Sequence, residues 1–169
     1  VLINKGMAAR EAMLYEKAEE SLNKAMEISD KIQNRRLLAL AYLALAEVEV
    51  YIENYNRSNH NLSNAFTIFA QRHDRLHLAS VYHVFGLLHL FQDHYELADS
   101  EFLMSLKINE DQNDILNLAC VYKDYSKLAK ELGDVSAQQE RLQKALELFQ
   151  SVQAVKRADR VEVELQSLA

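Results

Sequence analysis

The sequence repeats itself with a period of about 40 residues, and this period constrains the fold more than any other feature. Tyr15, Tyr55 and Tyr95 recur at this one interval, and Val135 falls at the same phase. Other columns share the spacing and hold residues of similar size: Ala18/Ser58/Ala98/Gln138, Leu22/Leu62/Phe102/Leu142, Ala25/Ala65/Ser105/Ala145 and Ile28/Ile68/Ile108/Leu148. Within a unit, these residues follow at intervals of three or four, which place side chains on one face of an α-helix. Each unit therefore contains an amphipathic helix.

A second set of columns marks another helix in each unit. The columns are Leu38/Leu78/Leu118, Ala41/Val81/Val121/Val161, Tyr42/Tyr82/Tyr122, Leu45/Phe85/Tyr125 and the small residues Ala46/Gly86/Ser126. Asn34, Asp74 and Asp114 precede these helices and are suitable N-caps. Asn54, His94 and Asp134 form a column just ahead of the other helix. The pattern predicts first helices near 35–52, 75–92 and 115–132, which alternate with second helices near 14–31, 55–72, 95–108 and 135–152.

Composition agrees with helices alone. Proline is absent and glycine occurs only three times, so the residues that sharp turns and sheet corners require are scarce. A single amphipathic hairpin cannot bury its apolar stripe, whereas stacked hairpins share one continuous core. We therefore predict an all-α fold of stacked helix hairpins.

The columns resemble those of the tetratricopeptide repeat (TPR) family. Its first helix carries an aromatic residue, a large apolar residue and an adjacent small one, and its second helix opens with aromatic-x-x-small before a large residue and an alanine. One unit follows this order through Tyr82, Phe85, Gly86, Tyr95, Ala98, Phe102 and Ser105. The units holding Tyr42, Ala46, Leu62 and Ala65, and Tyr122, Ser126, Leu142 and Ala145, match similarly. The resemblance covers nearly the whole chain and implies a right-handed superhelical solenoid of antiparallel helix hairpins.

The chain departs from the family in two respects. Its unit, about 40 residues long, exceeds the family's commonest length of about 34 residues. The proline that usually follows the second helix is missing. The longer unit is similar to repeats in bacterial signalling regulators and in several eukaryotic scaffold proteins.

The register extends to both ends of the chain. Gly6 lies one full period before Ala46, so residues 1–13 are expected to be the tail of a first helix whose start is absent. Residues 155–168 are expected to form one more first-type helix, whose charged residues suit a terminal cap: Lys156, Arg157, Asp159, Arg160, Glu162 and Glu164. We expect a single TPR-like domain over 1–169, with a partial repeat at 1–14, repeats at 15–54, 55–94 and 95–134, and a last one at 135–169. We expect it to be a fragment of a larger protein.

The resemblance also implies a binding face, because in this family the first helices line the concave surface where ligands usually lie. The helix near 75–92 is apolar on two faces, and exposed apolar patches mark interaction sites. The predicted partner-binding groove has an apolar floor and a basic end, and consists of Leu43, Glu47, Tyr51, His83, Leu87, Leu90, Phe91, Lys123, Lys127, Lys130 and Arg160. It would suit an amphipathic helix or an acidic peptide. Alternatively, the superhelix itself covers Leu87, Leu90 and Phe91, and the lysines form a solvated face.

Charge and cysteine content narrow the function classes. The formal net charge of −6, from 25 acidic and 19 basic residues, disfavours a nucleic-acid-binding surface. No apolar run approaches the length of about 20 residues that a membrane-spanning helix needs, so we expect no membrane partner. Cys120 is the only cysteine, which excludes an internal disulfide and fits a cytoplasmic location. Its apolar neighbours favour a buried packing residue over a nucleophile.

No motif indicates catalysis, a cofactor or a metal. His73 and His77 have the i, i+4 spacing of a helical metal site, but they flank the expected N-cap Asp74. Three scattered glycines cannot form a phosphate-binding loop. Carboxylate pairs such as Glu19 and Glu20 are typical of a solvated helix face. We expect a protein that is not an enzyme.

Two hypotheses about function remain. The first is a TPR module that binds a peptide or protein on its concave face within a larger regulatory or signalling protein. The second is a structural scaffold or self-association domain within a multi-subunit assembly, which would make homo-oligomers.

Overall fold

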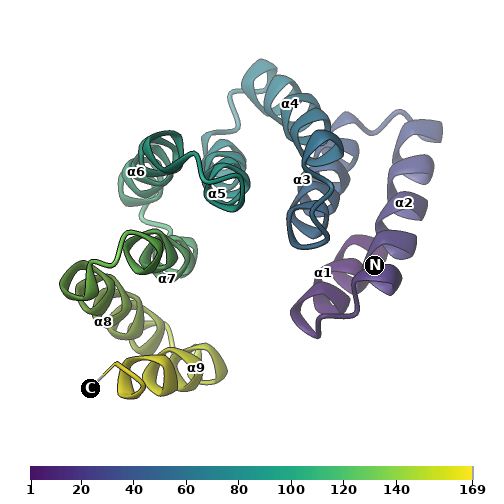
Figure 1. The fold of residues 1–169 in the computed structure, drawn as a ribbon. Coiled ribbons are helices and arrows are strands. Elements are labelled where there is room, and N and C mark those ends of the chain that lie inside the picture. The colour runs from purple at the N-terminus through teal and green to yellow at the C-terminus, as the bar shows by residue number, and fades with distance from the viewer. Residues whose placement is uncertain (169) are drawn as a thin grey trace.

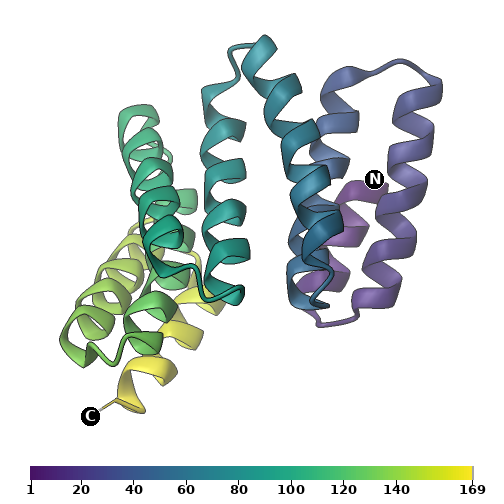
Figure 2. The ribbon, with the colours of Figure 1, turned by 45° about the horizontal axis from the view of Figure 1, so that its top comes forward.

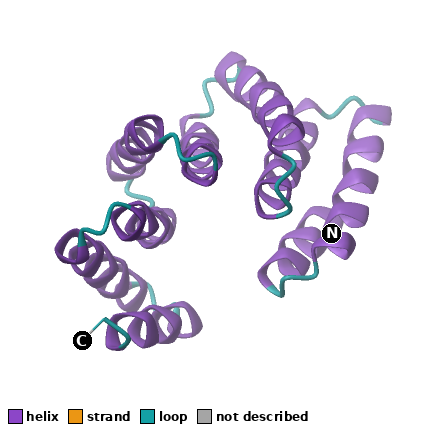
Figure 3. Ribbon diagram, viewed as in Figure 1, coloured by secondary structure: helices purple, strands orange, loops and turns teal. Residues whose placement is uncertain are grey.

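The structure, a computed structural model, describes residues 1–168, and within them the chain forms α-helices joined by short turns (Figure 3). The helices of this part are α1 (Leu2–Glu11), α2 (Tyr15–Lys31), α3 (Arg35–Tyr51), α4 (Tyr55–Gln71), α5 (Arg75–Phe91), α6 (Tyr95–Gln112), α7 (Ile115–Glu131), α8 (Val135–Ser151) and α9 (Val155–Gln166). The prediction of an all-α fold is therefore confirmed.

Consecutive helices pack as hairpins. The pairs are α1 with α2, α3 with α4, α5 with α6 and α7 with α8, and α9 packs on α8. The odd-numbered helices also touch along the array, α1 with α3, α3 with α5 and α5 with α7. The hairpins follow one another along an arc, in which the odd-numbered helices lie on the inner side (Figures 1 and 2). The predicted solenoid of stacked helix hairpins is confirmed.

The predicted helix boundaries agree with the structure except at α6. The sequence pattern placed the end of this helix near residue 108, but α6 continues to Gln112. Ile108 and Asn109 are both buried, and Asn109 Nδ2 donates to the backbone oxygen of Ser105 at 3.0 Å. The helix is therefore held by tertiary packing for one more turn than its apolar column indicated.

The turns recur at half the repeat period, and each contains one residue in the left-handed region. These residues, with φ between 52° and 71°, are Met13, Gln33, Glu53, His73, Asp93, Asn113, Gly133 and Gln153. After α2, the backbone N–H of Gln33 donates to Asp30 O, and that of Asn34 donates to Ser29 O, both at 2.9 Å. This pair of hydrogen bonds is the Schellman closure, in which glycine usually takes the left-handed position. The chain makes the same turn almost without glycine.

Polar side chains begin the inner helices as the sequence predicted. Asn34, Asp74 and Asp114 each accept a hydrogen bond from the backbone N–H three residues later. In the second column only Asp134 caps its helix in this way, whereas Asn54 and His94 precede α4 and α6 without a side-chain cap. The first column of polar residues therefore marks the start of α3, α5 and α7.

The core explains why small and large residues alternate. A Cβ atom added to Gly86 would lie 2.8 Å from the ring of fully buried Phe102, and one added to Gly6 would lie 2.5 Å from the side chain of Leu22. The column of small residues on the inner, odd-numbered helices therefore packs against the column of large residues on the outer, even-numbered helices. The fully buried Leu62 and Leu142 belong to the same outer column.

Candidate partner-binding surface

Aromatic and cationic side chains of α3, α5 and α7 meet on the inner side of the arc. Tyr51 of α3 stacks on Tyr15 with ring centroids 5.9 Å apart and meets Phe91 of α5 edge-on at 5.7 Å. Lys127 of α7 places its Nζ 5.8 Å from the centroid of the Tyr51 ring. Since α5 lies between α3 and α7, a contact from Lys127 to Tyr51 spans the inside of the curve. The inner surface is consequently narrow, and its floor at this point is aromatic.

A buried carboxylate organises the charges beside this floor. Asp124 Oδ2 lies 2.9 Å from His83 Nε2, and Asp124 Oδ1 lies 2.8 Å from Lys127 Nζ and 3.5 Å from Lys123 Nζ. Burial opposes ionisation of Asp124, but Lys127 and the hydrogen bond from His83 outweigh it and hold the pKa of Asp124 well below its usual range. Burial likewise disfavours charged Lys127, yet Asp124 raises the pKa of Lys127. The site is therefore an ionised network at neutral pH.

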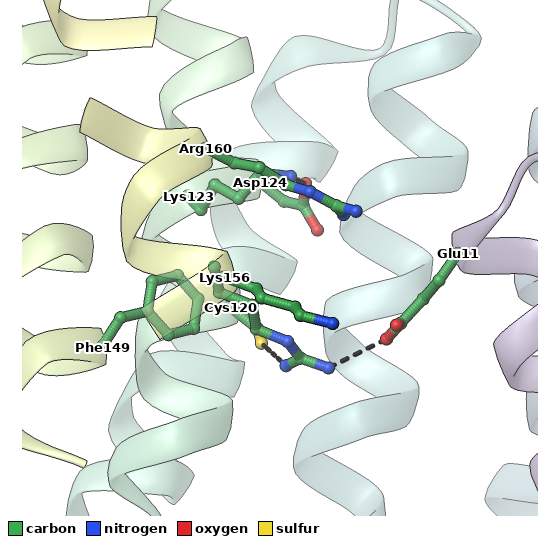
Figure 4. A pocket seen from close by; sticks show the side chains of 8 residues that line it. Glu11, Cys120, Lys123, Asp124, Phe149, Lys156 and Arg160 are labelled. Carbon is green, nitrogen blue, oxygen red and sulfur yellow. Dashed lines mark hydrogen bonds and ion pairs between the residues drawn. The ribbon is translucent and has the colours of Figure 1, made fainter. Parts of the chain in front are cut away.

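A cavity with basic side chains along its wall, which we call the basic cavity, opens between α7 and α9. Its volume is about 290 Å³, and it is lined by Glu11, Cys120, Lys123, Asp124, Phe149, Lys156, Arg157 and Arg160 (Figure 4). Four of these residues are cations and two are carboxylates, in a chain whose net charge is −6. Within residues 1–168, no carboxylate lies within ion-pair distance of Lys156 or Arg160. The cavity thus concentrates positive charge that the fold does not neutralise.

Arg157 joins the two ends of the arc. Its Nη1 donates to Cys120 Sγ at 3.0 Å, and its Nη2 donates to Glu11 Oε1 at 2.9 Å. Glu11 belongs to α1 and is 146 residues away in the sequence. Figure 4 shows Glu11 approaching from the α1 side, while Lys156 and Arg160 extend toward it from α9. Helices α1 and α9 therefore meet across the inner side through one ion pair.

A second cavity, of about 400 Å³, lies toward the other end of α7. It is lined by Leu90, Phe91, Asp93, Lys127, Lys130, Glu131 and Glu164. Both charge signs occur along its wall, next to the edge of Phe91, which is 39% exposed. Together with the basic cavity it makes the inner surface a groove with an aromatic centre and mixed charges.

The structure brings most of the predicted groove residues to this surface. Tyr51 contacts both Phe91 and Lys127, Lys123 and Arg160 line the basic cavity, and Leu90 and Lys130 line the second one. His83 contacts Asp124. Glu47 is engaged by Arg10 of α1 in an ion pair.

Leu43 and Leu87 do not belong to the surface, and their assignment to the groove was wrong. Leu87 is fully buried and Leu43 is 9% exposed, because α3, α5 and α7 pack directly against one another. Helix α5 has neighbours on both sides, so its second apolar face is core. The alternative interpretation, in which the superhelix covers Leu87, Leu90 and Phe91, holds for Leu87. Leu90 is mostly buried but still lines the second cavity, and Phe91 keeps an exposed edge.

The predicted groove lacked Glu11, Lys156 and Arg157. The charged register of residues 155–164 already indicated the two cations of α9. Nothing in the sequence placed Glu11 beside them, because that contact depends on the curvature of the whole array. Arg10, which holds Glu47, was missed for the same reason.

Cys120 is partly buried and packs against the core formed by α8 and α9. Burial raises the pKa of its thiol, with the positive charge of Arg157 acting in the opposite direction. A raised pKa disfavours the thiolate that nucleophilic chemistry requires. The thiol acts here as a hydrogen-bond acceptor for Arg157 rather than as a fully buried packing residue.

His73 and His77 lie on either side of the N-cap Asp74, as the sequence predicted. His73 occupies the left-handed turn position, while His77 lies in α5 and its Nδ1 is 2.8 Å from Asp74 Oδ1. No cluster of metal-binding side chains occurs among residues 1–168. In the same part of the chain, no helix has the length and apolarity needed to cross a membrane.

The fold places the chain among helical repeat solenoids. A solved structure, that of BtubC (BKLC) from P. vanneervenii, superposes with a TM-score of 0.63 at 14% sequence identity, over 95% of this chain and 75% of that one. At this identity the likeness extends to the fold alone. No protein-family model matches the sequence, and no curated protein sequence matches it.

Proposed function

We propose that the chain is a protein-binding module of the tetratricopeptide-repeat type, which holds an extended or helical segment of a partner protein on its inner surface. The observation that carries this proposal is the pair of unneutralised cations, Lys156 and Arg160, in the basic cavity. Solvated surface cations are ordinary, but two that converge on a concave space with Arg157 make a site for negative charge. The chain would serve this role within a larger regulatory protein.

The aromatic centre supports the same proposal. Phe91 lines the second cavity and meets Tyr51 edge-on, and interface hot spots are enriched in aromatic residues and arginine. An amphipathic partner segment with an apolar side chain over Phe91 and a carboxylate near Lys156 would satisfy both ends of the surface.

A selection experiment tests the proposal. Short peptides are selected from a random display library on the immobilised chain, and their Kd values are measured against variants. Phe91→Ala and Lys156→Gln on the inner surface are expected to weaken binding about tenfold, the loss that a hot-spot truncation produces. Leu103→Ala and Lys107→Gln on α6 are matched controls, since both residues are exposed there, and they should leave Kd unchanged.

Two outcomes would contradict the proposal. Selected peptides that bind all four variants alike would show that the inner surface is not the recognition site. Peptides that respond only to the α6 variants would place recognition on the outer helices.

A scaffold role is the second candidate, favoured by apolar side chains of α9 that the fold leaves open. Val155 is 63% exposed and Val163 is 67% exposed. If these residues mediate self-association, light scattering will give a mass above that of one chain, and Val163→Ser will return it to the single-chain value. In that case the inner-surface variants will leave the measured mass unchanged.

A further inference from the structure

The ion pair between Glu11 and Arg157 has the features of an exchangeable contact. The side chains of Glu11 and Arg157 are 47% and 41% exposed. An ion pair open to water to this extent contributes little to stability. Glu11 also has another cation nearby, because Arg10 Nη2 lies 4.0 Å from Glu11 Oε1. The carboxylate of Glu11 can therefore leave Arg157 at low free-energy cost.

Glu11 also differs from the other carboxylate of the basic cavity, because it reaches the cavity from a distant part of the chain. The other one, Asp124, is 7% exposed and is already engaged by His83 and Lys127. Removing Glu11 from the cavity leaves Lys156, Arg157 and Arg160 facing the same space without an ion-pair partner among residues 1–168. Glu11 thus shows which chemical group the cavity accommodates, and by occupying it competes with any other.

We propose that the basic cavity is a carboxylate-binding site that Glu11 occupies in the free protein, and that an acidic side chain of a partner segment binds by displacing Glu11 from Arg157. The inference rests on the proposed function and adds to it the chemical class of the ligand group and an internal competitor. Binding then also releases α1 from α9, so occupancy of the cavity is coupled to the contact that closes the arc.

An acidic peptide fits the surface better than a nucleic acid does. A guanidinium binds a carboxylate with well-directed hydrogen bonds, and the basic cavity already holds such a pair, Arg157 with Glu11, at 2.9 Å. Nucleic-acid binding requires an extended cationic surface, whereas this chain carries a net charge of −6 and its basic cavity presents four cations in one small space.

Hexaglutamate with amidated ends and a fluorescent label is a suitable probe, and its Kd is measured by anisotropy at physiological ionic strength. Under this condition charges more than about 8 Å apart are largely screened. Glu11→Gln removes the competitor and is expected to tighten binding about two- to fivefold, the range that an exposed ion pair allows. Arg157→Gln and Arg160→Gln are expected to weaken binding about tenfold, the loss that follows removal of a charge-assisted hydrogen bond.

Matched controls separate these effects from net charge. Glu27→Gln makes the same charge change as Glu11→Gln at an exposed position near the far end of α2, and Arg72→Gln matches Arg157→Gln at the exposed end of α4. Neither control should alter the Kd of hexaglutamate. Circular dichroism of each variant verifies that its helical content is retained.

The inference is overturned if Glu11→Gln and Glu27→Gln tighten binding equally, if Arg157→Gln has no effect, or if hexaglutamate fails to bind the Glu11→Gln variant. These failures are distinct from failure of the proposed function. Hexaglutamate has no apolar side chain, so Phe91→Ala should weaken the selected peptides and leave hexaglutamate unaffected. Loss of only the Glu11 effect overturns this inference, whereas selected peptides that bind Phe91→Ala and Lys156→Gln as tightly as the unchanged chain overturn the proposed function.

Discussion

Helices α5 and α7 occupy the same place in consecutive repeats, yet they present different residues at equivalent positions. Val84, Leu87 and Leu90 of α5 correspond, one period later, to Asp124, Lys127 and Lys130 of α7. The three residues of α5 are buried. In α7, by contrast, Asp124 is buried within a charge network and Lys130 is exposed.

The difference shows how one repeat frame supports two kinds of inner surface. Complete burial of a leucine such as Leu87 stabilises the fold by about 1.5–3 kcal/mol. A buried ion network contributes little net stability, because desolvation offsets much of the attraction. Helix α7 therefore carries charged groups that contribute little to the stability of the fold.

The largest effect is expected when a residue of α7 is introduced into α5. Leu87→Lys places an ammonium group in a site that is fully buried and lacks a carboxylate partner, and it should lower the free energy of unfolding by about 3–5 kcal/mol. Urea unfolding at pH 7 measures the loss. Leu103→Lys, on the exposed side of α6, should change stability by less than about 0.5 kcal/mol. If Leu87→Lys and Leu103→Lys both lowered the free energy of unfolding by the same small amount, the inner side of α5 would be open to water.

Removing the central carboxylate of α7 should have the next largest effect. Asp124→Asn leaves Lys127 without its ion-pair partner and should lower the free energy of unfolding by about 2–3 kcal/mol at pH 7. Because the folded pKa of Asp124 is depressed, its contribution is complete above the unfolded value of about 3.9 and is lost as pH falls through the folded value. The gap between wild type and variant should therefore narrow only below about pH 4. A gap that closes between pH 7 and 5 would contradict the ionised network.

A double substitution sharpens the comparison by giving α7 the residues of α5. Asp124→Val together with Lys127→Leu replaces charged groups by apolar ones. The free energy of unfolding of this double variant should lie within about 1 kcal/mol of the wild-type value, since such replacements are often neutral. The same variant should bind selected acidic peptides more weakly. A double variant as unstable as Asp124→Asn would mean that the network, rather than apolar packing, holds α7 in place.

The two repeats also differ in their small residue. Gly86 of α5 corresponds to Ser126 of α7, and a Cβ at Gly86 would lie 2.8 Å from Phe102. Gly86→Ala should therefore lower the free energy of unfolding by about 1–3 kcal/mol, despite the higher helix propensity of alanine. Phe102→Leu introduces the residue found at Leu142, and the two changes together should cost less than the sum of the single changes. Strict additivity in thermal or urea unfolding would exclude direct packing of Gly86 on Phe102.

The least destabilising change extends the comparison to α3, which buries Glu49 without a surplus of cations. Burial raises the pKa of Glu49, while Asn61, which donates to Oε2 at 2.8 Å, and Arg57 act in the opposite direction. A raised folded pKa means that stability falls as pH rises from the unfolded value of about 4.3 through the folded one. Wild type should therefore gain stability relative to Glu49→Gln between pH 7 and 4.5, opposite to the trend for Asp124. If the stability difference between wild type and Glu49→Gln stayed constant over this interval, the Glu49 carboxylate would lie in a more polar environment than the structure shows.

Much of the fold could be predicted because it depends on local pattern. The capping column Asn34, Asp74 and Asp114 marked helix starts, and these side chains do cap α3, α5 and α7. The end of α6 could not be predicted in the same way, since the burial of Asn109 depends on tertiary packing. Local signals thus placed the helices, and long-range packing adjusted one boundary.

The candidate site was less predictable because it depends on curvature. The sequence assigned Lys123, Lys127 and Phe91 to the groove, and these residues do lie on the inner surface. It could not show that Leu87 is fully buried, nor that Glu11 of α1 pairs with Arg157 of α9. A periodic sequence specifies contacts between adjacent repeats, whereas contacts across the arc follow from rotations accumulated over several repeats.

The most direct test of the account is to map where a selected peptide binds by nuclear magnetic resonance, with the ¹⁵N-labelled chain. We predict that the largest amide shift changes fall on the inner surface, at Tyr51, Phe91, Lys127, Lys156, Arg157 and Arg160. Shift changes concentrated on the outer helices, at positions such as Leu103, Lys107 and Lys144, would contradict the claim that departures from the repeat on the inner side form the binding site.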